Sequence, residues 1–566
     1  MSSSVLIIYV FFVIVFTSLF LLGNAGWVDP DSLPEDMYTS SYHDGSTYDL
    51  VMSDEFEVDG RRFDDGHDPR WTAIHKDDYT NNALQYYNRN LVKTKHGKLV
   101  INTIMEDVSF KAEDKESGKL KTMTKNYQSA MVQGWNKFCF TGGIVEMRAR
   151  LPGSHKIGGL WPAMWLLGNL ARATYVGSSD NVWPWSYNQC KQKLQFGQEI
   201  SACNSVNHYD MHAFMGRGAP EIDLLEAMPG VEILKKTNIK KPYFSSSLQV
   251  SPGLLEFRPE VGDIPMKGKW YEKDLEYGKE MNTSLNIFFY GVKLDNLKDK
   301  RKAYQADAVS ANTNIGQTHF DDFHTYRLEW TPGQHGHLKW YLDGIFLYSI
   351  GKNALNITGA QIPEEPMYLL LNTAMSKTWG FPQPCPEGCA CDCYDCRDEK
   401  CSCALPTNMC DNFPAEFEID WVRLYQKVND SSQTIGCSTT DYPTSRYIKG
   451  HKKLFMGEHD TEPLQPQIVG GALCEAHIDC GKGKCITGIC ECEKNWVGPN
   501  CLASLGWNDI DWEPEEPIVI DSIFIPTTLR IWAVVFLLLI FAVVGYKYYS
   551  EKKEHEYSEI PEIEVL

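Results

Sequence analysis

The pattern of apolar and charged positions predicts a short β-strand at residues 221–226. Carboxylates interrupt a run of Ile and Leu here, and turn-forming residues bound the run on both sides. Side chains on a regular strand alternate between two faces, so Glu221 and Asp223 share a face while Glu226 points the other way. A β-bulge at residues 224–225 would add one residue and return Glu226 to the face of Glu221. The pattern therefore predicts three carboxylates along one cleft.

Two longer apolar runs lie near the ends of the chain. Residues 5–22 are apolar, and small residues follow at the spacing that signal peptidase prefers. We therefore expect a cleaved signal peptide over residues 1–25, with an uncleaved anchor as the alternative. Residues 531–546 are also continuously apolar and predict a transmembrane helix over residues 529–549. Because acidic residues precede this run and lysines follow it, we expect a cytosolic tail at 550–566 and a lumenal or extracellular body.

The composition is typical of a globular protein with one large core and an accessory module. The chain has 566 residues, of which 43% are hydrophobic and 12% aromatic, which is enough to bury a sizeable core. Its formal net charge is −20. Because nucleic-acid phosphates require a basic patch, we expect no nucleic-acid partner. A neutral polysaccharide is compatible with this charge.

Carboxylates placed in this way suit the two-carboxylate chemistry of retaining glycosidases. In that mechanism two carboxyl groups about 5–5.5 Å apart act as nucleophile and as acid/base, and their proximity splits their pKa values. We assign Glu221 as the nucleophile and Glu226 as the acid/base. Asp223 would hydrogen-bond Glu221 and hold its charge and rotamer. The alternative is an acidic strand on a solvated surface, which the two leucines of the run disfavour.

The motif Glu-x-Asp-x-x-Glu in this context resembles glycoside hydrolase family sixteen, the laminarinase and licheninase clan. Members of that family carry the nucleophile, the assisting Asp and the acid/base at these positions. Other segments resemble the same family in the same order, at residues 53–56, 159–166, 323–330, 340–344 and 417–425. The resemblance spans residues 47–428, and its motifs together are more specific than any one alone. It implies an all-β fold, a concanavalin-like β-jelly-roll sandwich with a catalytic role.

An insertion near residues 168–217 narrows the resemblance, because a simple laminarinase would not be expected to carry it. Together with residues 216–221 and 245–252, it resembles the fungal β-glucan synthesis-associated membrane proteins of the killer-toxin-resistance class. Those proteins are implicated in making β-1,6-linked glucan. The resemblance implies a membrane-held enzyme that transfers a glycosyl unit to a sugar rather than to water. The fungal proteins place their membrane segment before the catalytic domain, whereas the stronger apolar run here follows it.

Aromatic residues are candidates for the platforms that stack on the apolar faces of sugar rings. Five tryptophans are assigned to this role: Trp161, Trp165, Trp183, Trp185 and Trp379. Core packing is the competing explanation for each. Trp161 and Trp165 share a strand face by their even spacing, and the family position favours the cleft. Trp183 and Trp185 lie on the insertion, where we expect a wall on the acceptor side.

Two polar residues are further candidates for the site. His324 is either a sugar contact or a buried hydrogen-bonding histidine. Asp420 resembles a structural calcium ligand of some family members, although one carboxylate is weak support for a site that needs six or more oxygens. We therefore expect no required cofactor, with structural calcium as the one candidate ion.

Cysteine usage indicates an oxidising secretory compartment. The chain has 18 cysteines, an even number, and N-glycosylation sequons at Asn282, Asn356 and Asn429. Eight of the cysteines crowd into a second insertion at residues 384–411. In a cytosolic protein such a cluster would favour zinc. Behind a signal peptide we expect a loop held by disulfides.

A second module is expected after a polar linker at residues 429–472. Its cysteine spacing over residues 473–502 resembles an epidermal-growth-factor-like repeat, which implies three disulfides and either a spacer or a contact surface for a protein partner. The cysteines are Cys474, Cys480, Cys485, Cys490, Cys492 and Cys501. An acidic, proline-containing stalk at residues 503–528 would then lead to the membrane.

These observations favour a membrane-anchored retaining β-glucan transglycosylase that makes or remodels β-1,6 branches or β-1,3/1,6-glucan. It would be a single-pass protein of the secretory or endomembrane system (ER, Golgi, vacuole or plasma membrane), and its partner would be a β-glucan polysaccharide or oligosaccharide. Two alternatives remain open. One is a laminarinase-like hydrolase of β-1,3-glucan, and the other is a non-catalytic glucan-binding assembly protein.

Overall fold

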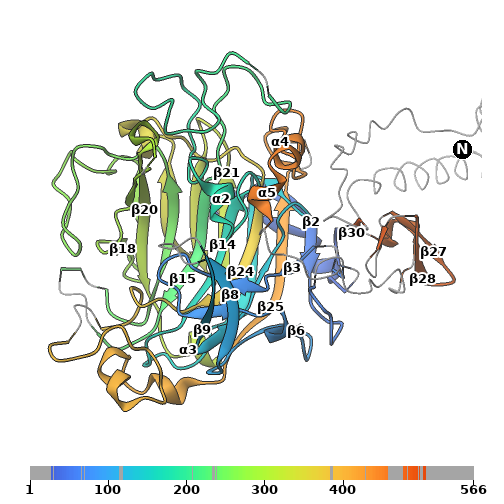
Figure 1. Cartoon of the computed structure of the whole chain (residues 1–566). Coiled ribbons are helices and arrows are strands. Elements are labelled where there is room, and N and C mark those ends of the chain that lie inside the picture. Colours follow the sequence, from blue (N-terminus) through green and yellow to red (C-terminus); the bar gives the residue numbers. More distant parts are fainter. Residues whose placement is uncertain are drawn as a thin grey trace, which may run out of the picture. The chain divides into compact units, whose positions relative to one another are not determined.

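Two antiparallel β-sheets are the main elements of the part of the chain that the computed structural model describes (Figure 1). The structure describes residues 27–456 and 474–504, apart from 30, 65–66, 69, 114–118, 207, 233–235, 238, 297, 383–385, 428, 475, 481, 495, 498–500 and 502. The predicted signal peptide (1–25), transmembrane helix (529–549), cytosolic tail (550–566) and most of the stalk lie outside these residues. Among the residues described, no helix combines the length and the apolar character that a membrane crossing requires.

The first sheet has ten strands among the described residues, and the second has eleven. The first follows the order β1 (Tyr38–Ser40), β2 (Thr47–Asp54), β25 (Ala415–Gln426), β13 (Gly143–Arg150), β21 (His324–Thr331), β22 (His337–Leu342), β23 (Ile345–Gly351) and β17 (Leu275–Tyr277), with β7 (Leu99–Thr103) beside β25 and β6 (Val92–Thr94) beside β7. The second follows the order β18 (Ser284–Leu285), β20 (Tyr304–Asn314), β16 (Tyr243–Val250), β15 (Glu221–Met228), β14 (Trp161–Gly168), β24 (Met367–Ala374), β11 (Met131–Gln133) and β3 (Thr72–Ala73), with β12 (Phe140–Thr141), β19 (Val292–Leu294) and β26 (Thr434–Ile435) attached.

Shorter elements surround the sheets. The α-helices are α2 (Val176–Ser179), α3 (Thr318–Asp321), α4 (Ser445–Gly450) and α5 (Lys452–Phe455). The 3-10 helices are η1 (Pro34–Met37), η2 (Arg89–Leu91), η3 (Lys300–Lys302), η4 (Ala354–Ile357), η5 (Glu399–Ala404), η6 (Met409–Asn412) and η7 (His477–Cys480). Small sheets are formed by β4 (Lys76–Asp77), β5 (Gln85–Tyr87) and β10 (Tyr127–Ser129), by β8 (Val108–Glu113) with β9 (Leu120–Lys125), by β27 (Gly483–Ile486) with β28 (Ile489–Cys492), and by β29 (Trp496–Val497) with β30 (Ala503–Ser504).

The main core lies between the two sheets. It contains alternate residues of the strands, such as Met164 and Leu166 of β14 together with Leu328 and Trp340 of the first sheet. The side chains between these positions therefore point to the outer face of their sheet. This arrangement confirms the predicted all-β, jelly-roll-like sandwich, and the strands predicted from the motifs at 159–166, 221–226, 323–330 and 417–425 are present.

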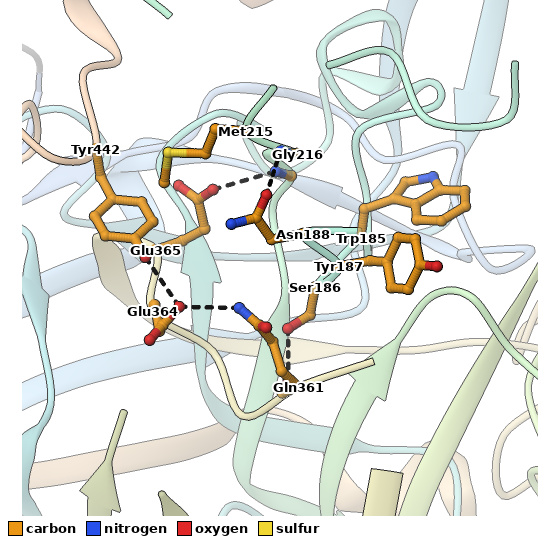
Figure 2. A pocket seen from close by; sticks show the side chains of 11 residues that line it. Trp185, Ser186, Tyr187, Asn188, Met215, Gly216, Gln361, Glu364, Glu365 and Tyr442 are labelled. Carbon is orange, nitrogen blue, oxygen red and sulfur yellow. Dashed lines mark hydrogen bonds between the residues drawn. The ribbon is translucent and has the colours of Figure 1, made fainter. Parts of the chain in front are cut away.

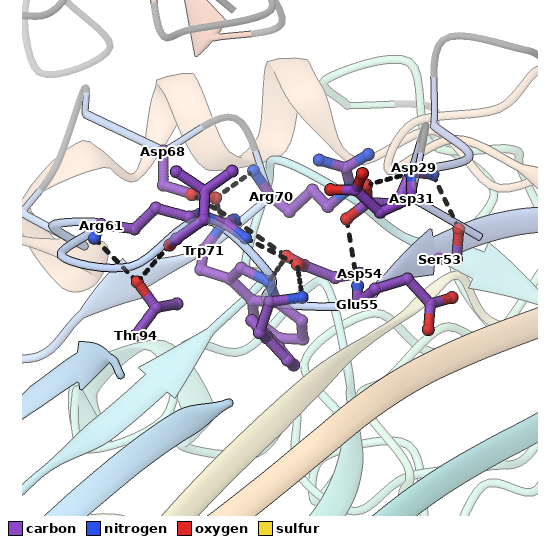
Figure 3. A network of polar contacts seen from close by, with 12 residues as sticks. Asp29, Asp31, Ser53, Asp54, Glu55, Arg61, Asp68, Arg70, Trp71 and Thr94 are labelled. Carbon is purple, nitrogen blue, oxygen red and sulfur yellow. Dashed lines mark hydrogen bonds and ion pairs between the residues drawn. The ribbon is translucent and has the colours of Figure 1, made fainter. Parts of the chain in front are cut away.

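The motif at residues 53–56, near the start of the sandwich, contains a buried carboxylate (Figure 3). Asp54 accepts hydrogen bonds from Arg61 at 2.6 and 2.9 Å and from the indole of Trp71 at 2.8 Å. Burial opposes ionisation of Asp54, but the charge and hydrogen bonds of Arg61 outweigh it, so the pKa of Asp54 lies below its usual value. The motif therefore joins β2 to the loop that follows it.

A second apolar cluster joins the insertion to the outer face of the second sheet. Leu167 and Tyr368 from the sheet pack with Val182 of the insertion and with Tyr447 and Phe455 of helices α4 and α5. We refer to residues 434–455 as the C-terminal segment. The prediction of a polar linker over 429–472 is therefore wrong for this segment, because its apolar side chains cover the insertion and β26 pairs with β12.

Disulfides hold the loops as predicted. Cys139 is bonded to Cys437 and Cys190 to Cys203. In the cysteine-rich loop the bridges are Cys389–Cys403, Cys393–Cys401 and Cys396–Cys410, so the described cysteines there are in disulfides rather than a zinc site. In the small module the predicted three bridges are Cys474–Cys485, Cys480–Cys490 and Cys492–Cys501. The sequon residues Asn282, Asn356 and Asn429 are exposed, and their glycosylation stays a prediction.

Candidate active site

Strand β15 carries the predicted carboxylates, and it contains the predicted bulge. On the β16 side, Asp223 lies opposite Ser247 and Glu226 opposite Ser245, so two residues of β15 face the single residue between these partners. The pairing of β15 with β14 shifts at the same place. Both bulge residues, Leu224 and Leu225, are buried in the core between the sheets. The bulge thus lets two adjacent leucines both point into the core, which a regular strand does not allow, and it returns Glu226 to the outer face.

Glu221 receives hydrogen bonds from two sides. The indole of Trp183, on the insertion, donates from Nε1 to Glu221 Oε2 at 2.8 Å. The carboxyl of Asp223 provides the second hydrogen bond, as predicted for the assisting residue. Glu221 is half-buried, whereas Asp223 is 1% exposed. The candidate nucleophile is therefore fixed by its own strand and by the insertion.

Asp223 is held by two residues that the sequence motif does not reveal. Gln249 of β16 donates from Nε2 to Asp223 Oδ2 at 3.3 Å. On the core side, Trp340 of β22 donates from Nε1 to the main-chain oxygen of Asp223 at 3.0 Å. Trp340 belongs to the opposite sheet, so this hydrogen bond crosses the sandwich to the strand residue that precedes the bulge.

An aromatic pair lies beside Glu226. Trp161 and Trp379 stack with ring centroids 4.6 Å apart and an angle of 15° between planes. Trp379 Nε1 donates to the main-chain oxygen of Ala227, the residue after Glu226, at 3.4 Å. Both rings are half-buried and keep part of their surface open. Sugar stacking by these two residues stays a prediction.

Burial raises the pKa of all three carboxyl groups, but to different extents. Burial raises the pKa of Glu221 to about 7, against the hydrogen bonds from Trp183 and Asp223. Burial and the charge of Glu221 raise the pKa of Glu226 to about 8, against a polar interaction with Trp161. Burial and the charges of both glutamates raise the pKa of Asp223 well above its usual value. Between pH 7 and 8 this order favours an ionised Glu221 beside a protonated Glu226.

Two other predicted aromatic residues behave differently. Trp165, opposite Asp223, is half-buried and donates from Nε1 to Asn372 Oδ1 at 2.8 Å, so it remains a candidate sugar contact. Trp185 is 0% exposed and packs against Tyr187 and Tyr304. The prediction that Trp185 forms part of a sugar-binding wall is therefore wrong in this structure, because a buried indole has no free face.

His324 and Asp420 lie on the first sheet, whereas the carboxylates lie on the second. The His324 ring contacts Asp343 through Nδ1 at 2.6 Å and stacks on His319, with centroids 3.8 Å apart. Of the two alternatives for His324, this favours the hydrogen-bonding histidine over the sugar contact. Asp420 forms an ion pair with Arg148. A cation at Asp420 would compete with that guanidinium, so calcium there stays an unsupported expectation.

A small polar cavity adjoins the site without including any of the three carboxylates (Figure 2). It lies where the insertion meets the loop before β24 and the C-terminal segment. Tyr442 donates its hydroxyl to Glu364 Oε2 at 3.0 Å, and Gln361 donates to the same oxygen at 2.9 Å. Next to this cavity, Arg217 forms a bidentate ion pair with Glu365, at 2.6 and 2.7 Å. These contacts fix the chain immediately before Glu221.

Comparison with known proteins shows which families the chain is similar to. The family model "Beta-glucan synthesis-associated protein SKN1/KRE6/Sbg1" matches residues 14–384 and 405–463. The chain is 30% identical over 460 residues to the beta-glucan synthesis-associated protein KRE6 of Saccharomyces cerevisiae, which covers 77% of this chain and 54% of KRE6. It is 23% identical over 391 residues to a beta-glucanase of Rhodothermus marinus, covering 67% of this chain and 86% of that protein.

A solved structure with a related description is the endo-beta-1,3-glucanase from Pyrococcus furiosus. It covers 70% of this chain and 99% of its own, with 19% sequence identity and a TM-score of 0.37. The chain spans about half the length of the curated KRE6 relative that it matches. The family match extends through the C-terminal segment and leaves out residues 385–404 of the cysteine-rich loop.

Proposed function

Because the chain belongs to the family of beta-glucan synthesis-associated proteins SKN1/KRE6/Sbg1, we propose that it is a retaining β-glucan transglycosylase that makes or remodels β-1,6 or β-1,3/1,6-linked glucan. One observation carries the proposal. The bulge in β15 puts Glu221, Asp223 and Glu226 on one face, and the pKa of Glu221, about 7, lies below that of Glu226, about 8. A retaining mechanism needs that combination.

In the first step, an oxygen of Glu221 attacks the anomeric carbon of a donor glucan. The glycosidic bond breaks, and Glu226 gives its proton to the leaving oxygen. The product is a glycosyl ester of Glu221. Asp223 supports this step because its protonated carboxyl donates a hydrogen bond to Glu221 and keeps it oriented.

In the second step, Glu226 works as a base. It removes the proton from an acceptor hydroxyl, whose oxygen attacks the anomeric carbon. The ester bond to Glu221 breaks, and its electron pair returns to the carboxylate. Glu226 ends protonated, as it began, so the cycle can repeat. A sugar hydroxyl as acceptor gives transfer, and water gives hydrolysis.

Transfer is preferred in this proposal because the insertion walls the site beside Glu221. Trp183 touches Glu221, and the insertion is held by an apolar cluster rather than left as a loose loop. A hydrolase of β-1,3-glucan is the second candidate and differs only in how well water reaches the ester. A non-catalytic glucan-binding assembly protein is the third, although the complete set of carboxylates speaks against it.

The cellular setting belongs to the same proposal. The apolar runs at 5–22 and 531–546 and the exposed sequons support a single-pass protein of the secretory or endomembrane system, with the active site lumenal or extracellular. The disulfide-bonded module at 474–504 would act as an epidermal-growth-factor-like spacer or as the contact surface for a protein partner.

The deciding experiment is mass spectrometry of products formed from a defined β-1,3-glucan oligosaccharide at high concentration. Purified full-length protein should produce oligosaccharides longer than the substrate. Glu221→Gln should abolish them while glucan binding persists. Glu199→Gln, which changes an exposed glutamate on the insertion in the same way, should leave them unchanged.

Other results would redirect the proposal. Shorter products alone would make the protein a hydrolase. Binding without any product would favour the assembly protein. Turnover that survives in Glu221→Gln would show that Glu221 is not the nucleophile.

A further inference from the structure

We propose that Trp183 is a positioning residue for Glu221, so that the insertion, as well as β15, sets the geometry of the nucleophile. This inference rests on the proposed function, in which Glu221 attacks the sugar. It goes beyond the expectation that Trp183 stacks on a sugar, because the interaction in question is a hydrogen bond from the indole N–H to a carboxylate oxygen.

The contact has the geometry of a strong hydrogen bond. Trp183 Nε1 lies 2.8 Å from Glu221 Oε2, within the range of charge-assisted N–H···O bonds. The two residues are 38 positions apart in the chain. Of the donors found for Glu221 among the described residues, Asp223 belongs to the same strand, whereas Trp183 comes from a separate part of the chain.

The backbone of Trp183 is fixed on several sides, as a positioning role requires. Its N–H donates to the oxygen of Ser179 at 2.9 Å, and its own oxygen accepts the hydroxyl of Tyr304 at 2.5 Å. At the next residue, the oxygen of Pro184 accepts the N–H of Ser251 at 3.2 Å. Tyr304 is in β20 and Ser251 directly follows β16, so the second sheet holds the main chain that carries the indole.

This contact matters most when the charge on Glu221 changes. In the glycosyl ester one oxygen of Glu221 is bonded to the sugar, and the carboxylate charge is gone. When the ester breaks, the electron pair returns to Glu221, and a preplaced N–H donor stabilises the charge that develops. The same donor selects the carboxylate rotamer that attacks in the first step.

Trp183→Phe separates this role from sugar stacking, because phenylalanine keeps an aromatic ring but lacks the N–H. Loss of a hydrogen bond to a charged group should lower kcat about 10- to 100-fold. Since the Trp183 bond lowers the pKa of Glu221, the acidic limb of the kcat/KM profile should move to higher pH. A role in stacking alone would leave this limb in place and raise KM.

Trp185→Phe is the matched control. Trp185 lies two residues further along the insertion, and its indole nitrogen has no hydrogen-bond partner among the described residues. Its variant should keep the wild-type pH profile, whatever its effect on the melting temperature. A Trp183→Phe profile and kcat equal to wild type, with Glu221→Gln inactive, would overturn the positioning role and leave the proposed function intact.

A second readout does not depend on turnover. The infrared carboxyl band that disappears in Glu221→Gln reports the titration of Glu221 directly. Its midpoint should rise in Trp183→Phe and stay in place in Trp185→Phe. If no variant or wild-type protein turns over glucan, the proposed function fails, and this midpoint still decides whether Trp183 holds Glu221. An unchanged midpoint would overturn the inference.

Discussion

Arg217→Met should destabilise the domain by removing one half of a buried ion pair. The Arg217 side chain is 0% exposed, and that of Glu365 is 8% exposed. Arg217 also donates to the main-chain oxygen of Pro443 at 2.9 Å, so it joins the insertion to the C-terminal segment. Methionine preserves most of the apolar stem but leaves the Glu365 carboxylate buried without its partner.

The structure allows the size of the effect to be estimated. Breaking a buried ion pair on one side costs about 3–5 kcal/mol. A domain of about 430 residues has an unfolding entropy of about 0.9 kcal/mol/K, since each residue contributes about 2.1 cal/mol/K. The melting temperature should therefore fall by about 3–6 °C.

Differential scanning calorimetry of the purified full-length protein measures this shift. Arg301→Met is the control, because Arg301 pairs with Asp299 on the surface and should show no measurable change. The double variant Arg217→Met with Glu365→Gln should recover at least half of the decrease in melting temperature. Glutamine removes the unpaired charge, and its amide oxygen can still accept the N–H of Gly218.

Two results would refute this reasoning. The first is an Arg217→Met protein that melts at the wild-type temperature, which would mean that water or another group compensates Glu365. The second is a double variant less stable than the single one, which would show that the lost stability came from packing of the arginine stem and not from an unpaired charge.

Three further predictions concern the site and its support. Turnover needs Glu221 ionised and Glu226 protonated, so pKa values of about 7 and about 8 predict a kcat/KM profile that peaks between pH 7 and 8. The rate should fall at lower pH because Glu221 gains a proton, and at higher pH because Glu226 loses its proton. A maximum below pH 6 would contradict this. Trp340→Phe should lower the free energy of unfolding, measured by urea denaturation, by about 1–3 kcal/mol, because the main-chain oxygen of Asp223 stays buried without this donor. An unaltered midpoint would mean that another donor replaces the indole. Cys437→Ser removes the bridge to Cys139, which closes a loop of 298 residues, and should cost about 2–5 kcal/mol; a melting temperature equal to that of the oxidised wild type would argue against it.

The family resemblance predicted the fold class, and the local pattern predicted the strand that carries the three carboxylates. The sequence allowed the three carboxylates to be placed on one face. In a regular strand Glu226 would point away from Glu221 and Asp223, and a bulge at the two adjacent leucines corrects this. The stacking pair of Trp161 and Trp379 lies beside them. In each case the predictive signal lay in a few neighbouring residues or in a family motif.

Contacts between distant parts of the chain could not be predicted in this way. Gln249 and Trp340 support Asp223 from 26 and 117 positions away, and nothing in their local sequence marks that role. The C-terminal segment was expected to be a linker because its few apolar residues are dispersed among polar ones. Its burial becomes visible only once the insertion provides the surface that Phe455 covers. Trp185 was misassigned for the same reason.

The attachment of the C-terminal segment also sets the order in which the protein can be built. Arg172 of the insertion donates to the main-chain oxygen of Phe455 at 2.8 Å, and Asn169 donates to Thr444 Oγ1 at 3.1 Å. Those acceptors are translated more than 270 residues after their donors. Glu221 therefore leaves the ribosome well before residue 455 is synthesised. Until then, the insertion that contacts Glu221 lacks the C-terminal segment that supports it. Contacts of such sequence separation form late, so the candidate active site is completed only after nearly all of the sandwich has left the ribosome.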